Sequence, residues 1–169
     1  MSVACASSPS SVDCGANHDH HSCIETALAR AETLCVERGA RLTVLRRRVL
    51  ELVWSGHQPR GAYQLLEELG HNGRAAAPLT VYRALAFLVE QGLVHRIESL
   101  NAYVGCPVPD AGHTGQFLVC DQCGVATEIN DPRVTQAVRD SAEELGFRIQ
   151  QTTVEIRGRC LRCHGGAPA

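Results

Sequence analysis

The sequence contains no lysine, few aromatic residues and no long apolar run. Aromatic residues make up 4% of the 169 residues, so we expect a core built mainly from Leu, Val, Ala and Ile. Membrane helices need about 18 or more apolar residues in a row, so no membrane span is predicted. Residues 1–12 have no basic start and no apolar stretch, so we expect a cytoplasmic protein without a secretory signal. The 44% hydrophobic and 20% charged residues predict a globular protein of one ordinary domain or two small ones.

All 16 basic residues are arginines, and they are unevenly distributed. Residues 41–96 hold eight Arg and four Glu, whereas the whole chain has a net charge of −2. The positive charge is therefore concentrated in one segment, as contact with a phosphate backbone would require. Arginine suits bidentate contacts to phosphate or guanine. A genome-wide codon bias would produce the same lack of lysine, and both explanations stay open.

Apolar residues recur at helical spacing in the first half of the chain, and two short strands follow. The predicted helices cover residues 24–38, 43–55, 62–69 and 80–91. The predicted strands cover residues 93–98 and 102–106, on either side of a turn at Asn101. Thr43 and Thr80 are predicted N-caps. The last three helices and the hairpin predict a winged helix-turn-helix, whose third helix enters the DNA major groove.

A Pro- and Gly-containing segment, residues 107–115, separates this part from a second pattern and is a predicted hinge. The second pattern predicts strands at 116–119 and 125–129, a helix at 131–145 and a strand at 147–156. The predicted fold class is therefore α+β. Its parts are a mobile tail (1–22), a winged-helix DNA-binding domain (23–106), the hinge, and a small α/β domain (116–169).

Two Cys-x-x-Cys pairs supply the four thiolates of a closed, structural zinc site. They are Cys120/Cys123 and Cys160/Cys163. The 36 residues between the pairs exceed the spacing of short zinc knuckles, so the intervening strands and helix must bring the pairs together. A redox role is disfavoured, because thioredoxin-like pairs occur singly at a helix start in a βαβ unit.

Other potential zinc ligands occur on both sides of the predicted hinge: His95, Cys106, His113 and Glu128. One metal ion bound by all four would connect the two domains. Spacing alone leaves open that His95 is structural and that Glu128 is solvated. The tail has a further group, Cys5, Cys14, His18, His20, His21 and Cys23. That group either binds metal loosely or has no role.

The third winged-helix segment carries the candidate base-reading residues near its start. Tyr82 and Arg83 fall opposite Val81 and Leu85, and Thr80 lies next to them. Arg83 fits a guanine edge, and Tyr82 fits a thymine methyl or a phosphate. The alternative is a solvated Arg and a partly buried Tyr. Candidate phosphate contacts are Arg41, Arg46 and Arg60.

Enzymatic classes fit these motifs poorly. A zinc-dependent nucleobase deaminase needs His-x-Glu upstream of Pro-Cys-x-x-Cys, and neither Cys pair follows a proline. No cysteine has an evident base partner for hydrolysis. A zinc-ribbon interaction module would leave the basic helices unexplained. We therefore expect no catalytic activity and no small-molecule substrate.

Several motifs resemble the Fur superfamily of bacterial metal-responsive repressors, over roughly residues 24–163. They are the 78–85 run, Gly92-Leu93-Val94-His95 and Cys120-x-x-Cys123-Gly124. The greatest similarity is to its zinc uptake regulators, in Leu42-Thr43, Thr80–Leu85, Glu90-Gln91-Gly92, Asn101–Cys106 and Cys120–Gly124.

The resemblance implies a homodimer that binds palindromic operators when zinc is replete, with residues 116–169 as the dimerisation domain. It implies two Zn²⁺ per subunit: a structural ion at the four cysteines and a regulatory ion at His95, Cys106, His113 and Glu128. The iron-sensing branch usually has a His-His-x-His type cluster before its Cys-x-x-Cys, whereas residues 113–120 contain one His. A thiolate ligand favours zinc over iron; a regulator of another divalent metal such as iron is the alternative.

Overall fold

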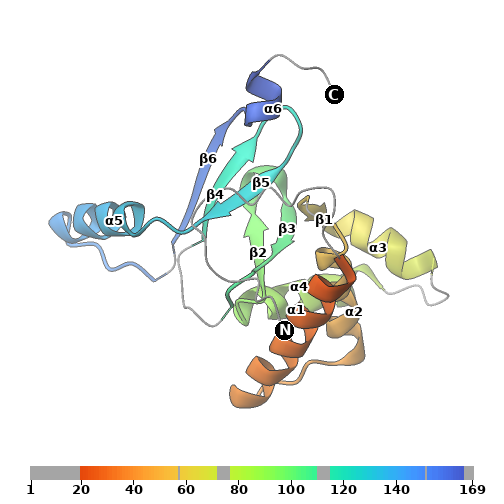
Figure 1. The fold of residues 1–169 in the computed structure, drawn as a ribbon. Coiled ribbons are helices and arrows are strands. Elements are labelled where there is room, and N and C mark those ends of the chain that lie inside the picture. The colour runs from red at the N-terminus through yellow and green to blue at the C-terminus, as the bar shows by residue number, and fades with distance from the viewer. Residues whose placement is uncertain (1–19, 57, 72–76, 110–114, 151, 166–169) are drawn as a thin grey trace, which may run out of the picture.

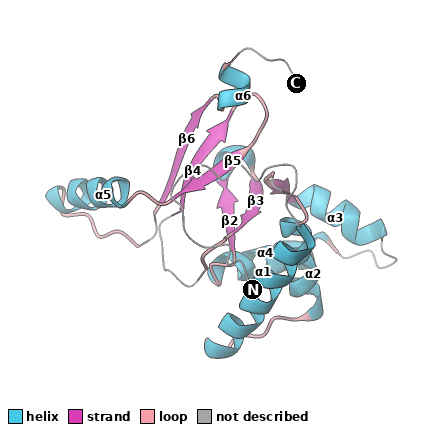
Figure 2. Cartoon of the chain, in the orientation of Figure 1, coloured by secondary structure: helices cyan, strands magenta, loops and turns pink. Residues whose placement is uncertain are grey.

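The computed structural model describes residues 20–56, 58–71, 77–109, 115–150 and 152–165. Within these residues the chain is α+β, with helices grouped in its N-terminal part and two small sheets after them (Figure 1; Figure 2). The N-terminal helices are α1 (His20–Glu37), α2 (Val44–Trp54), α3 (Ala62–His71) and α4 (Pro78–Glu90). None of the described helices is long and apolar enough to span a bilayer.

The first sheet, which we call the wing sheet, has the strand order β1-β3-β2 and is antiparallel. Its strands are β1 (Arg60–Gly61), β2 (Val94–Ile97) and β3 (Ala102–Gly105). The short 3₁₀ helix η1 (Glu98–Leu100) links β2 to β3 and ends at Asn101, which has φ 47°. Asparagine tolerates this left-handed conformation better than most residues, so the predicted turn is confirmed.

The second sheet, the C-terminal sheet, has the order β5-β4-β6. Its strands are β4 (Gly115–Cys120), β5 (Ala126–Ile129) and β6 (Thr153–Gly158). β4 and β5 are antiparallel, whereas β6 runs parallel to β4 because α5 (Pro132–Glu144) lies between β5 and β6 in the chain. α6 (Leu161–His164) follows β6. In Figure 1, α5 extends away from the helices of the N-terminal part.

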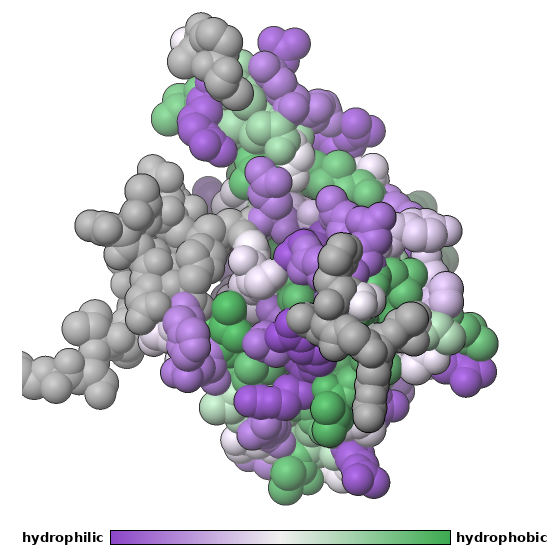
Figure 3. All heavy atoms as spheres, turned by 90° about the vertical axis from the view of Figure 1, so that its right-hand side faces the viewer, coloured by the Kyte–Doolittle hydropathy of each residue, from purple (hydrophilic) through white to green (hydrophobic). Residues whose placement is uncertain are grey.

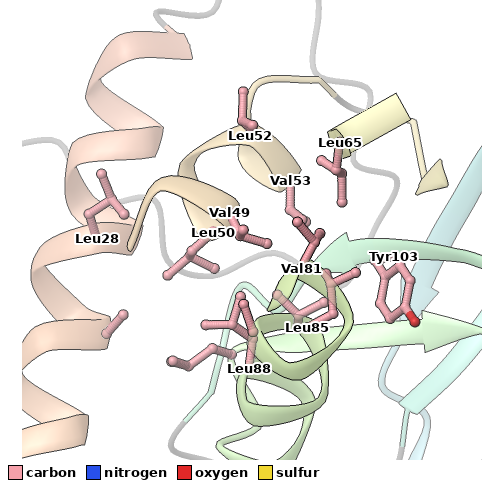
Figure 4. Close-up of a cluster of buried hydrophobic side chains, with 14 of the residues drawn as sticks. Leu28, Val49, Leu50, Leu52, Val53, Leu65, Val81, Leu85, Leu88 and Tyr103 are labelled. Atoms are coloured by element: carbon pink, nitrogen blue, oxygen red, sulfur yellow. The ribbon is translucent and has the colours of Figure 1, made fainter. Parts of the chain in front are cut away.

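The main core forms where α1, α2, α3 and α4 meet β3 (Figure 4). Val81, Leu85 and Leu88 of α4 are fully buried, at the spacing that places them on one helix face. They pack with Val49 and Val53 of α2. Burying one such side chain contributes about 1.5–3 kcal/mol, so this apolar face fixes α4 and leaves its other face to solvent.

Three boundaries differ from the sequence prediction. Thr43 caps α2 by accepting the Arg46 N–H at 3.4 Å, but the prediction for Thr80 was wrong. α4 begins earlier, with Ala77 as its N-cap and Pro78 at the first helical position. Proline is favoured there because its missing N–H would have no partner inside the helix. α1 begins at His20 with polar residues that apolar periodicity does not detect. β6 begins at Thr153, after an exposed Phe147.

Candidate metal centres and nucleic-acid interface

The four predicted zinc-binding cysteines meet at one end of the C-terminal sheet. Their Sγ atoms lie within 4.8 Å of one another. Cys120 ends β4 and is paired with Gly158 of β6. The turn that follows contains Cys123 and ends at Gly124, which has φ +71°. Cys160 is the N-cap of α6, which the sequence did not predict, and Cys163 lies within that helix. Parallel pairing of β4 and β6 thus brings distant Cys pairs together, and we call this group the cysteine cluster.

Hydrogen bonds in the cysteine cluster separate the thiol pKa values. The backbone N–H of Cys160 donates to Cys120 Sγ at 3.3 Å, and together with the N–H of Cys123 it lowers the pKa of the Cys120 thiol to about 6. The nearby Cys160 side chain raises the pKa of Cys163 to about 12. Thiolates this close repel one another, so a cation is needed for all four to ionise. The donor set fits a closed tetrahedral zinc site.

A second potential metal site joins the two sheets. His95 of β2, Cys106 after β3 and Glu128 of β5 each place a ligand atom within 4.8 Å of the others. We call these three residues the mixed cluster. His95 Nε2 lies 3.2 Å from Glu128 Oε1, and Cys106 is 3% exposed. Nitrogen, thiolate and carboxylate together form a donor set suited to zinc. His113, the fourth predicted ligand, lies outside the described residues.

Packing fixes the orientation of His95. Its ring meets the ring of Phe117 edge-on, with centroids 5.2 Å apart and an interplanar angle of 62°. A Cβ on Gly115 would lie 2.8 Å from the Phe117 ring and 3.3 Å from His95 Nδ1. Glycine at this position therefore lets β4 approach the wing closely enough for the mixed cluster to form.

The chain is held in place at Cys106 and in the segment that follows it. Its N–H donates to the Leu93 carbonyl at 3.0 Å, which extends the β2–β3 pairing by one step. A Cβ on the preceding Gly105 would overlap the ring of Trp54. Arg38, directly after α1, donates to the carbonyl oxygens of Gln91 at 2.5 Å and Pro109 at 3.3 Å, and Arg30 of α1 donates to that of Pro107 at 3.4 Å. Helix α1 and the residue after it thus anchor the segment that leaves Cys106.

The start of α4 presents the predicted base-reading residues to solvent. Thr80, Tyr82 and Arg83 are exposed, with Tyr82 at 40%, whereas Val81 and Leu85 are fully buried. Tyr63, at the start of α3, is a further large aromatic side chain on the surface and is 73% exposed. The sequence did not single it out, because a sequence does not show which aromatic side chains are exposed. In Figure 3, hydrophilic side chains alternate with smaller hydrophobic areas on the face that is shown.

The three candidate phosphate contacts differ in availability. Arg41 is exposed. Arg46 lies over the Phe87 ring, 3.5 Å from its centroid, and donates to the Arg41 carbonyl. Arg60 is half-buried, pairs with Glu68 and donates to Ser55 Oγ. Its interactions inside the protein account for this arginine without DNA.

Comparisons with known proteins place the chain in a family. Residues 37–157 match the model of the Ferric uptake regulator family. The chain is 40% identical over 137 residues to the zinc uptake regulation protein of Escherichia coli (strain K12), with 80% of each chain covered. The protein therefore belongs to the Ferric uptake regulator family. This membership confirms the resemblance and the prediction of a regulator rather than an enzyme.

Solved structures are similar over most of the chain. A zinc uptake regulator complexed with zinc and DNA is 38% identical, with a TM-score of 0.79 and coverage of 84% of this chain and 95% of that one. Holo XcZur is 42% identical, with a TM-score of 0.77 and coverage of 83% and 99%. Apo XcZur covers similar shares, 85% and 99%, at 40% identity, but its TM-score is 0.50. The chain is thus arranged like the holo form rather than like the apo form.

Proposed function

We propose that this protein is a zinc-responsive transcriptional regulator that represses zinc uptake genes in the cytoplasm when zinc is replete. The mixed cluster carries the proposal, because its ligands come from both sheets. His95 and Cys106 belong to the wing and Glu128 to the C-terminal sheet. The similarity to the holo rather than the apo form of XcZur supports a conformation set at this site.

The two metal centres have different roles in this proposal. The cysteine cluster binds structural zinc and joins the ends of β4 and β6. The mixed cluster, with His113 as its fourth ligand, binds regulatory zinc. An ion held there would supply ligand bonds between the wing and the C-terminal sheet. Moving a two-state switch from mostly off to mostly on takes about 5.5 kcal/mol of differential binding, so the ion must favour the DNA-competent form by roughly that amount.

The DNA-binding domain in this proposal is residues 23–106, and α4 enters the major groove. Arg83 contacts a guanine edge, Tyr82 contacts a base or phosphate, and Thr80 contacts the backbone. Arg41 contributes a phosphate contact, while Arg46 and Arg60 contribute less because both are held within the protein. Tyr63 adds an exposed aromatic side chain on the neighbouring helix.

Residues 116–169 form the dimerisation domain of the proposed homodimer. Leu118 and Ile156 are in register on one face of the C-terminal sheet and are 42% and 46% exposed. The opposite face carries Phe117 and Val119, which are buried. No residue of α5 is buried. A second copy would cover Leu118 and Ile156, and the two-fold axis of the dimer would match a palindromic operator.

Replacing Cys106 by Ser tests the regulatory site. The variant keeps the size of the side chain but loses a soft thiolate ligand. We expect at least a tenfold rise, roughly, in the zinc concentration needed for half-maximal DNA binding. The probe is a duplex selected by the zinc-loaded wild type from a random-sequence pool. Binding is measured by fluorescence anisotropy at buffered zinc.

Cys35→Ser is the matched control, because Cys35 is a buried cysteine like Cys106, lies on α1 and belongs to neither cluster. Equal zinc dependence in Cys106→Ser and the control would refute the assignment of the mixed cluster. A titration with Fe²⁺ under anaerobic conditions tests the alternative metal. DNA binding at lower free Fe²⁺ than free Zn²⁺ would make the protein an iron regulator.

A further inference from the structure

Three residues form a row across the C-terminal sheet and face the wing. Phe117 of β4 is in register with Glu128 of β5 on one side and with Glu155 of β6 on the other. Residues directly opposite one another on paired strands project from the same face. Glu128 reaches His95, and Phe117 packs against the same ring. Glu155, the third member, has no part in either metal cluster.

Glu155 reaches the wing at a different point. Its Oε1 accepts the backbone N–H of Glu98 at 2.6 Å, and its Oε2 accepts that of Ser99 at 3.0 Å. Glu98 and Ser99 are the first two residues of η1, which connects the two wing strands β2 and β3. Hydrogen bonds to an ionised acceptor are shorter and stronger than neutral ones. One carboxylate therefore ties β6 to the tip of the wing.

This contact acts on the strand that carries His95. β2 ends at Ile97, directly before Glu98. Ile97 is fully buried and packs in a small core with Phe117 and Val119, between the two sheets. Holding η1 against β6 therefore fixes the C-terminal end of β2. His95 lies only two residues before that end, opposite Glu128.

We propose that Glu155 is a positioning residue for the regulatory metal site. Its hydrogen bonds favour the arrangement in which the wing lies against the C-terminal sheet and His95 faces Glu128, so that zinc has less of this arrangement to bring about. The inference rests on the proposed function. By linkage, a contact that favours the zinc-competent arrangement must raise the zinc affinity of that arrangement. Glu155 touches neither zinc nor DNA and acts through the position of the wing.

The test replaces Glu155 by Gln, which keeps the length of the side chain and removes its charge. The control is Glu98→Gln, which removes a carboxylate from the same turn; the Glu98 side chain is 64% exposed and pairs with Arg96. Zinc affinity of the mixed cluster is measured on the full chain by competition with a chelator, after the cysteine cluster is filled. DNA binding is measured at saturating zinc.

We expect Glu155→Gln to weaken zinc binding about tenfold, within the usual range of coupling between sites. At saturating zinc its DNA affinity should equal that of the wild type, because ligand bonds then hold the wing. Glu155→Asp, a second variant, keeps the charge but shortens the reach, and should weaken zinc binding by a smaller factor.

Zinc affinity of Glu155→Gln and Glu155→Asp equal to that of the control would overturn the inference. Loss of DNA affinity at saturating zinc would also overturn it, since Glu155 would then only stabilise the fold. A different result tests the proposed function itself. Wild-type protein that binds DNA equally with and without zinc would refute that function, whatever the Glu155 variants show.

Discussion

At the scale of single residues, Gly105 and the Trp54 ring pack closely beside the mixed cluster. Gly105 precedes the proposed ligand Cys106, and the Trp54 ring occupies the space where a Cβ would lie. The sequence offered no means to predict this contact. Gly105 lies in an ordinary strand pattern, and only the approach of α2 to β3 shows why a side chain is absent there.

Replacing Gly105 by Ala should destabilise the protein. The added methyl group overlaps the indole, and overpacking of this kind costs about 1–3 kcal/mol. Urea denaturation followed by circular dichroism gives the free energy of unfolding. Gly56→Ala is the control, because nothing lies within 4 Å of its Cβ position. Equal stability of the two variants would show that the Trp54 contact is not restrictive.

At the scale of elements, the helices and strands could largely be predicted, but their contacts could not. Apolar spacing identified α4, since burial of Val81 and Leu85 is a local periodic property. The two-residue β1 and the one-turn α6 were missed, because neither is long enough to show a period. Ligand types made the mixed cluster a candidate site and only the family resemblance singled it out, because the distance between His95 and Glu128 depends on packing between the sheets.

The contact of β6 with η1 should depend on pH in a definite direction. Burial alone would raise the pKa of Glu155, but hydrogen bonds from Ser99 and Glu98 and the charge of Arg157 lower it below its ordinary 4.5. A depressed pKa in the folded state adds stability above the ordinary value, and that stability is lost as the pH falls through the lowered pKa. The contact is therefore intact at neutral pH.

The difference in unfolding free energy between wild type and Glu155→Gln should therefore be constant above pH 4.5 and shrink below it. Denaturation of both proteins at each pH measures it, and contributions common to both cancel. A difference that grew towards acid would contradict the depressed pKa of Glu155.

At the scale of the whole molecule, the two faces of the C-terminal sheet are covered unequally. On the face away from the wing, Gln116 is buried and bonds to Thr135 at the start of α5, but the rest of that face is more open. The sheet's buried face packs on the wing, while Leu118 and Ile156 remain exposed on the other. The sequence alone could not reveal this asymmetry, because alternating apolar residues on both faces of β4 predict burial on both. The structure describes one chain, and the proposed second copy supplies the missing cover.

Replacing Leu118 by Glu should convert the proposed dimer to a monomer. A charge on the apolar face would be buried without a partner in the interface, which is strongly unfavourable. Size-exclusion chromatography with light scattering gives the mass. Val36→Glu on α1, where Val36 is 78% exposed, is the control and should leave the mass unchanged. A dimeric Leu118→Glu protein would place the interface elsewhere.

The contact between Trp54 and Gly105 has a practical consequence. The chain contains one tryptophan, and its ring lies on the backbone next to a ligand of the mixed cluster. The protein therefore carries its own optical reporter. If Cys106 binds the regulatory zinc as proposed, a change in the wing on metal uptake would alter the surroundings of that indole, and its emission would follow zinc loading without an added label.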